Sequence, residues 1–102
     1  MSIAVIIAVI LAVILVLRIT YVMWFNNTLK QADQAMRKGN HWTAMAELSL
    51  DRIQTYNEYA TARRFYRRAA RLYLSLGLYS DARFAVWSAV QAGKMWAKYL
   101  YM

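Results

Sequence analysis

The sequence predicts an all-α fold in which one N-terminal transmembrane helix precedes two antiparallel helical hairpins. Hydrophobic residues make up 22 of the first 25 residues, which is more than a globular domain carries. Proline is absent, and the three glycines stand at positions 39, 77 and 93. Residues 57–76 alternate polar and apolar side chains with helical periodicity. The alternation typical of β-strands does not occur along the chain.

Residues 1–25 are predicted to form a membrane anchor. The segment from Ile3 to Phe25 has 23 residues, which is about 34 Å of helix and enough to span a hydrocarbon core of about 30 Å. Arg18 interrupts this segment and leaves two registers open. Either the span ends at Phe25 and Arg18 reaches toward the headgroups, or the span ends at Arg18. No cleavage-site pattern of small residues follows, which favours an uncleaved anchor over a signal peptide.

Basic residues predict the side of the membrane on which the rest of the chain lies. Arg18, Lys30, Arg37 and Lys38 all follow the apolar run, whereas only two residues precede it. The positive-inside rule therefore places residues 26–102 in the cytoplasm. The protein is predicted to be a single-pass membrane protein with a cytoplasmic C-terminal domain.

Three alanines mark one face of the predicted span. Ala4, Ala8 and Ala12 are four residues apart and so line one side of a helix. Small residues at this spacing let two helices approach closely in lipid. The spacing predicts a helix-packing face, although alanine is also common in apolar stretches without that role.

Residues 26–94 are predicted to form the helical-hairpin domain. Thr28 and Gln31 match a capping box, so a helix either restarts at Thr28 or continues out of the membrane. The three glycines are expected to cap helix C-termini, and Asn40 is expected to cap the helix that follows it. Further helices are expected over residues 41–53, 57–76 and 79–92, with a turn at residues 54–57.

Part of this domain resembles a tetratricopeptide repeat, a helix–turn–helix unit with a 34-residue period. The residues that carry the resemblance are Tyr66, Ala69, Ala70, Tyr73, Gly77, Tyr79, Ala82, Val86 and Ala89. A weaker upstream unit contains Ala32, Ala35, Gly39, Trp42, Ala44 and Leu48. The closing proline of the family is missing near Lys94, and two of the glycines are 38 residues apart rather than 34. The resemblance implies two stacked hairpins, and a generic four-helix arrangement is the alternative.

Few residues of this chain suit catalysis or metal binding. The chain has no cysteine, one histidine and five acidic residues. This composition excludes a disulfide scaffold and a thiol nucleophile. His41 is interpreted as a packing or capping residue, and Glu47 and Asp51 as isolated solvated acids. We expect no enzyme activity, no cofactor and no metal site.

A row of arginines is the main candidate site. At helical spacing they fall on one arc of the helix predicted over residues 57–76. They are Arg63, Arg64, Arg67, Arg68 and Arg71. Such a row is either a solvated face or a binding surface, because the arginine fork suits carboxylates and phosphates. Under the tetratricopeptide resemblance, Arg64, Arg67 and Arg71 line the peptide-binding groove of the family.

Three ligands would suit this surface. An acidic segment of a partner protein is the first, and anionic lipid headgroups near the anchor are the second. Nucleic acid is the third and is disfavoured by the membrane span. The formal net charge of +8 is compatible with all three.

Residues 95–102 form an aromatic tail that includes Trp96 and Tyr99. The tail either packs back on the preceding helix or is an exposed contact for a partner or the bilayer interface. The sequence favours an exposed contact, because the outer face of a terminal repeat is normally polar. Together these features predict a membrane-anchored protein-interaction module, such as a small accessory or assembly subunit of a larger membrane complex. The alternative is a structural subunit that assembles with copies of itself into a homo-oligomer or filament.

Overall fold

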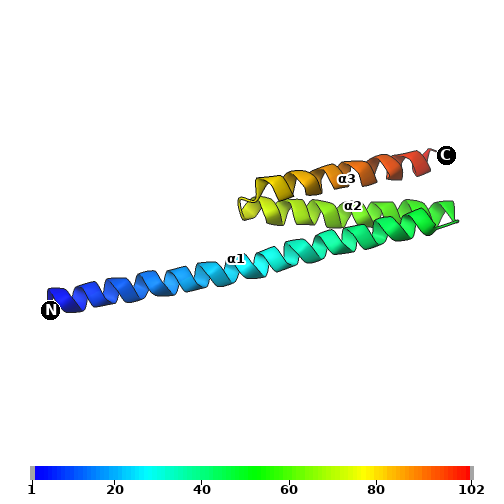
Figure 1. Ribbon diagram of the computed structural model, residues 1–102. Helices are drawn as coiled ribbons and strands as arrows, with labels where there is room; N and C mark the ends of the chain where they lie inside the picture. Colours follow the sequence, from blue (N-terminus) through cyan, green and yellow to red (C-terminus); the bar gives the residue numbers. More distant parts are fainter. Residues whose placement is uncertain (1, 102) are drawn as a thin grey trace.

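The computed structural model describes residues 2–101, which form three α-helices and contain no strand (Figure 1). α1 comprises Ile3–Leu48, α2 comprises Arg52–Ser75 and α3 comprises Tyr79–Leu100. The all-α prediction is confirmed. The predicted number of helices is wrong, because residues 41–48, expected to begin a separate helix, belong to α1. α1 and α3 both pack against α2. The described residues thus form two antiparallel pairs that share the central helix.

α1 is one unbroken helix of 46 residues, about 69 Å long at 1.5 Å per residue. Its N-terminus is capped by the Ser2 hydroxyl, which accepts a hydrogen bond from the backbone N–H of Val5 at 3.3 Å. Thr28 does not start a new helix but lies buried within α1. Of the two alternatives at this point, the continuous helix is the one observed. The predicted anchor and the residues that follow it therefore share one rigid element.

The N-terminal half of α1 extends beyond the other two helices (Figure 1). It is long and apolar enough to cross a membrane, and none of its most apolar stretch is buried against the rest of the chain. Ala4, Ala8 and Ala12 lie in this exposed half. The whole chain is accordingly elongated, with extents of 76 × 18 × 15 Å.

Gly39 is predicted to end a helix, but it lies inside α1 and is buried. A Cβ atom at this position would lie 2.7 Å from the ring of Tyr66 on α2. The absence of a side chain therefore serves close packing between α1 and α2 rather than a left-handed C-cap. Because α1 continues through this point, Asn40 does not cap a helix and no new helix begins at residue 41.

The turn between α1 and α2 comes earlier than the predicted turn at residues 54–57. α1 ends at Leu48, and α2 begins at Arg52 after a short turn. Asp51 caps α2, because its carboxylate accepts a hydrogen bond from the backbone N–H of Ile53 at 3.0 Å. The predicted turn at residues 54–57 is wrong, since those residues lie in the first turns of α2.

Gly77 ends α2 as predicted. Its φ of +74° is in the left-handed region, which glycine adopts without steric cost. The backbone N–H of Gly77 donates to the carbonyl oxygen of Leu74 at 3.1 Å, and that of Leu78 donates to Tyr73 at 3.0 Å. These two bonds form a Schellman motif, which reverses the chain so that α3 runs back along α2.

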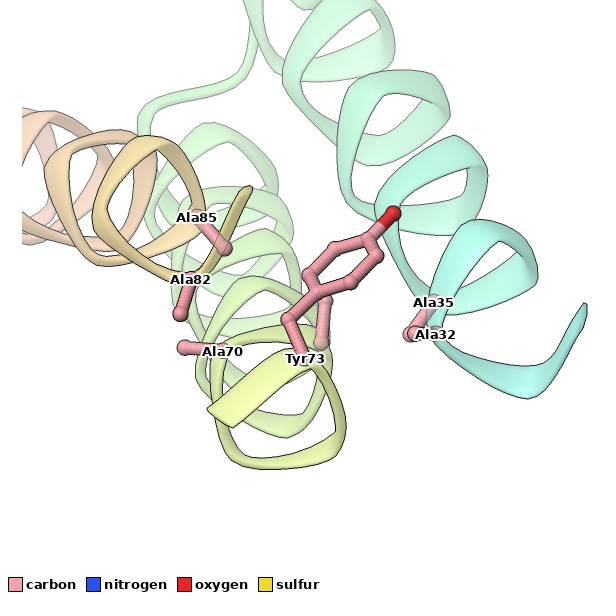
Figure 2. Packing of buried hydrophobic residues seen from close by; sticks show 7 residues of the cluster. Ala32, Ala35, Ala70, Tyr73, Ala82 and Ala85 are labelled. Atoms are coloured by element: carbon pink, nitrogen blue, oxygen red, sulfur yellow. The ribbon is translucent and has the colours of Figure 1, made fainter. Parts of the chain in front are cut away.

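The core consists of small residues on all three helices, with tyrosines of α2 among them. Figure 2 shows the ring of Tyr73 pointing from α2 toward Ala32 and Ala35 of α1. On α3 the buried positions are Ala82, Ala85, Ala89 and Ala92. Their spacing of three and four residues lines one face of the helix. Small side chains at such an interface let helix axes approach closely, and the larger tyrosine rings occupy the remaining space.

Two buried tyrosines also tie α2 to α1 by hydrogen bonds. The Tyr66 hydroxyl donates to Asn40 Oδ1 at 2.7 Å and lies 3.1 Å from Thr43 Oγ1. The Tyr73 hydroxyl donates to the carboxylate of Asp33. Because both rings are otherwise enclosed, these bonds satisfy polar groups that would be costly to bury alone.

Candidate functional site

The five arginines predicted as a row, Arg63 to Arg71 on α2, are all exposed, but they do not form one surface. Arg63, Arg67 and Arg71 line a groove between α2 and α3. Arg68 lines a smaller groove between α1 and α2, and Arg64 lines neither. The helical arc predicted from the sequence is therefore divided by the neighbouring helices, and three of its members share a site.

The groove between α2 and α3 combines an apolar floor with basic side chains. Its volume is about 710 Å³. Leu74 of α2 and Val86, Val90 and Trp96 of α3 contribute apolar surface. Three arginines of α2 and Lys94 of α3 supply the charge. Large aliphatic and aromatic groups beside several cations form a surface that suits an amphipathic, negatively charged ligand.

No acidic side chain within residues 2–101 lines the groove. The chain has five acidic residues, and none of them lines it. Glu58 is the acid nearest to the arginines in sequence, but it is buried, with 5% of its surface exposed. One of its oxygens accepts a hydrogen bond from Gln54 Nε2 at 2.8 Å. The basic side chains are thus available to a ligand from outside the chain.

Arg63 is positioned by two residues of α3. Its guanidinium carbon lies 6.0 Å from the centroid of the Trp96 ring, at the limit of a cation–π contact. A Cβ atom on Gly93 would lie 3.4 Å from Arg63 Nε. Gly93 is predicted to end a helix, but it lies inside α3. Its lack of a side chain instead leaves room for the arginine at the edge of the groove.

The aromatic tail is not a separate segment, because α3 continues to Leu100. Trp96 stacks on Tyr56 with ring centroids 5.4 Å apart, and Tyr99 stacks on Tyr59 at 5.9 Å. The tail therefore packs back, although on α2 rather than on its own helix. Trp96 also lines the groove, whereas the ring of Tyr99 is engaged with α2.

Arg52 binds the C-terminal end of α3, a role that no local sequence pattern predicts. Its Nε donates to the carbonyl oxygen of Tyr99 at 3.1 Å, and its terminal nitrogen donates to that of Leu100 at 3.4 Å. These carbonyls have no partner within the helix. The basic side chain thus caps α3 from the first turn of α2, across 47 residues of sequence, which a local pattern does not reveal.

A second groove of about 330 Å³ runs between α1 and α3, with Tyr59 and Tyr66 of α2 among its lining residues. Phe84 and Trp87 of α3 also line it, and their rings stack at 6.0 Å. These two side chains are 58% and 57% exposed. Their spacing of three residues makes them neighbours on a helix surface, so helical periodicity alone could have revealed this pair from the sequence.

Burial raises the pKa of three core tyrosines. Tyr59, Tyr66 and Tyr73 all titrate above the ordinary value of 10.0, and loss of hydration is the largest cause at each. At Tyr73 the hydrogen bond to Asp33 and the negative charge of that carboxylate raise the pKa further. All three are protonated at neutral pH, and Tyr66 and Tyr73 donate hydrogen bonds to α1, which indicates a structural role.

Within residues 2–101 no three His, Cys, Asp or Glu side chains lie together as a metal site would require. His41 is exposed and lies edge-on to Trp42, with ring centroids 5.7 Å apart. No protein-family model, curated protein or solved structure matches this chain. The tetratricopeptide resemblance therefore stays a prediction, and the function is argued from the geometry.

Proposed function

We propose that this chain is a membrane-anchored protein-interaction module that serves as a small accessory or assembly subunit of a larger membrane complex. The observation that carries the proposal is the groove between α2 and α3, which has an apolar floor, four basic side chains and no acidic one. An acidic amphipathic helix of a partner subunit would cover the floor with its apolar face and pair its carboxylates with the arginines.

The exposed half of α1 supports the anchoring part of the proposal. Its large aliphatic side chains have no cover from the rest of the chain. Contiguous apolar surface of this extent is not stable in water, whereas a bilayer solvates it. The basic residues on its C-terminal side support a cytoplasmic position for the packed domain. The protein is then a single-pass subunit with its groove outside the bilayer.

The direction of the groove indicates what kind of partner fits. α2 and α3 run alongside α1 (Figure 1), so a helix lying between them runs roughly parallel to the span. Such a helix stands along the bilayer normal, as the juxtamembrane continuation of another transmembrane helix does. The expected partner is therefore the acidic juxtamembrane segment of another membrane-complex subunit, and nucleic acid is disfavoured.

The tetratricopeptide resemblance agrees with this proposal. Members of that family use paired helices to hold peptides, and their small residues let the helices pack closely. Ala70 and Ala82, which match small positions of the repeat, belong to one buried cluster. Gly77 forms the turn between the two helices. The peptide-binding property itself is carried over only as part of the proposal.

The anchoring is tested by carbonate extraction of membranes that contain the full chain. The proposed integral anchor keeps the intact protein in the pellet, and a protease added to the cytoplasmic side degrades the packed domain. Recovery of the intact chain in the supernatant would refute the anchor. A protected packed domain in sealed vesicles of known orientation would refute the cytoplasmic placement.

The docking is tested with two triple variants that carry the same charge change. Replacing Arg63, Arg67 and Arg71 by Gln lowers the formal charge from +8 to +5 within the groove. Replacing Arg37, Arg64 and Arg68 by Gln lowers it equally outside the groove. In native mass measurements of the detergent-solubilised particle, the groove variant should lose its foreign subunits and the control should retain them. Equal retention would contradict the docking proposal.

The self-assembling subunit is the second candidate, and the exposed pair of Phe84 and Trp87 favours it. Stacked aromatic rings on a surface are common in interfaces between proteins. Ala4, Ala8 and Ala12 offer a further contact face in the membrane. The same native mass measurement separates the candidates, because a particle built from copies of this chain alone supports the homo-oligomer.

A further inference from the structure

The tip of the α2–α3 hairpin lies at the membrane end of the packed domain. α1 has no break between the apolar half and the packed half, so its axis fixes the position of the packed domain relative to the span. α2 runs antiparallel to α1 and returns toward the span (Figure 1). Tyr73 near the end of α2 bonds to Asp33 of α1, and Leu78 in the turn packs on the same cluster as Leu29.

The distance from the bilayer follows from the rise of α1. Leu29 is four residues beyond Phe25, which is about 6 Å along the helix. The headgroup region on each side of the hydrocarbon core is about 5–8 Å thick, given a total of about 40–45 Å and a core of about 30 Å. When the span ends at Phe25, the turn therefore reaches the headgroup layer.

The chemistry of the tip suits that layer. Tyr79 opens α3 and is 68% exposed, and Leu74 in the last turns of α2 is 56% exposed. Tyrosine is enriched at membrane interfaces because its ring is apolar and its hydroxyl is polar. Arg71 of α2 and Arg83 of α3 are both exposed and lie about one to two helical turns from the tip. The nearest acidic residue in sequence is Asp81, two residues before Arg83.

We infer that the α2–α3 tip is a second membrane contact, in which Tyr79 enters the interface and the flanking arginines bind anionic lipid headgroups. This inference rests on the proposed transmembrane anchor and on the register that ends at Phe25. It shares Arg71 and Leu74 with the docking groove, whereas Tyr79 and Arg83 lie outside that groove. Contact at both α1 and the tip holds the domain upright on the bilayer.

The chain contains no cysteine, so a single spin label reports one position in the full-length protein. Ser80→Cys places the label beside the tip, and Leu50→Cys places a control label at the opposite, fully exposed turn. Both variants are reconstituted in vesicles of phosphatidylcholine with phosphatidylserine. A water-soluble nickel chelate should collide several-fold less often with the label at position 80 than with the label at position 50. In vesicles of phosphatidylcholine alone this protection should weaken.

Combining Tyr79→Ser and Arg83→Gln with the label at position 80 should remove the protection while the helical signal and the docking groove are retained. Lowering the protein-to-lipid ratio separates two possible causes of the label's protection from the nickel chelate. Protection by a second copy of the chain falls on this dilution, whereas protection by lipid does not. The inference is overturned if the label at position 80 is as accessible as the control, or if its protection is lost on dilution. If such vesicles also resist carbonate extraction, the anchor stands and only the second contact fails. If carbonate releases the chain, the anchor fails and the tip contact with it.

Discussion

The two halves of α1 share one continuous backbone but differ in what surrounds them. Residues 3–25 carry large aliphatic side chains, almost all exposed, and have no partner helix within the described chain. Residues 28–46 bury small residues against α2, including Ala32, Ala35 and Gly39. The difference shows that high hydrophobicity does not by itself produce packing within this chain. In the packed half, small side chains and matching tyrosines allow close contact between helices.

Gly39→Leu should have the largest effect on the packed half. A Cβ atom there already lies 2.7 Å from the Tyr66 ring, and hydrogen bonds to Asn40 and Thr43 hold that ring in place. We expect a loss of about 3 kcal/mol in the free energy of unfolding, measured by denaturant titration in detergent micelles with circular dichroism.

The matched control is Gly93→Ala, where the new Cβ atom meets only the flexible side chain of Arg63 at 3.4 Å. Alanine has a higher helix propensity than glycine by about 1 kcal/mol, so this variant should be at least as stable as the original chain. Unchanged stability in Gly39→Leu would show that α1 and α2 are not in close contact at this point.

Alkaline pH should loosen the packed half through its core tyrosines. Their folded-state pKa values are raised above the ordinary 10.0, so the unfolded chain loses these protons first. Their contribution to stability is complete below pH 10.0 and is lost as the pH rises above it toward the raised folded values. Melting temperatures measured between neutral pH and strongly alkaline pH should show this fall.

Tyr73→Phe sharpens this measurement. At neutral pH the variant should lose about 1 kcal/mol, because the hydrogen bond to Asp33 is removed while the ring remains. Above pH 10.0 its stability should fall less steeply than that of the original chain, since one group with a raised pKa is gone. If the stability of the variant and of the original chain fell equally with rising pH, Tyr73 would make no contribution to the loss of stability at alkaline pH.

Ala8→Leu with Ala12→Leu should have the smallest effect on folding. Both positions are exposed in the half of α1 that has no partner in the chain, so the unfolding of the packed half should change by less than about 0.5 kcal/mol. The same variant measures assembly in the membrane. A smaller native particle would show that the alanine face joins helices, whereas an unchanged particle would remove that role.

Residue patterns that act over one or two helical turns were predictable from the sequence. The apolar run of residues 3–25 and the left-handed Gly77 were both recognised from local rules. Gly39 and Gly93 were misread because the same residue type serves close packing when a ring or a long side chain of another helix lies opposite. Which helix lies opposite is a tertiary fact that local spacing does not contain.

The candidate site was predictable to a similar degree. Helical periodicity identified the arginines of α2, but not that α3 would take three of them into a groove and leave Arg64 outside. Likewise the aromatic composition of residues 95–102 was evident, whereas the stacking of Trp96 on Tyr56 requires knowing that α3 continues to Leu100. Long-range pairing between helices accounts for both gaps.

α1 continues without a break through residues 26–28. The number of residues in this segment therefore determines how the packed domain is rotated about the helix axis relative to the N-terminal half. Deleting one residue at this junction would turn the domain by about 100° around the helix axis and draw it about 1.5 Å inward. With the proposed anchor in a bilayer, the groove would then face another direction in the membrane plane, although the contacts inside the domain would persist. The length of this segment thus fixes the direction in which the groove faces, and a flexible hinge at the same place would leave that direction undefined.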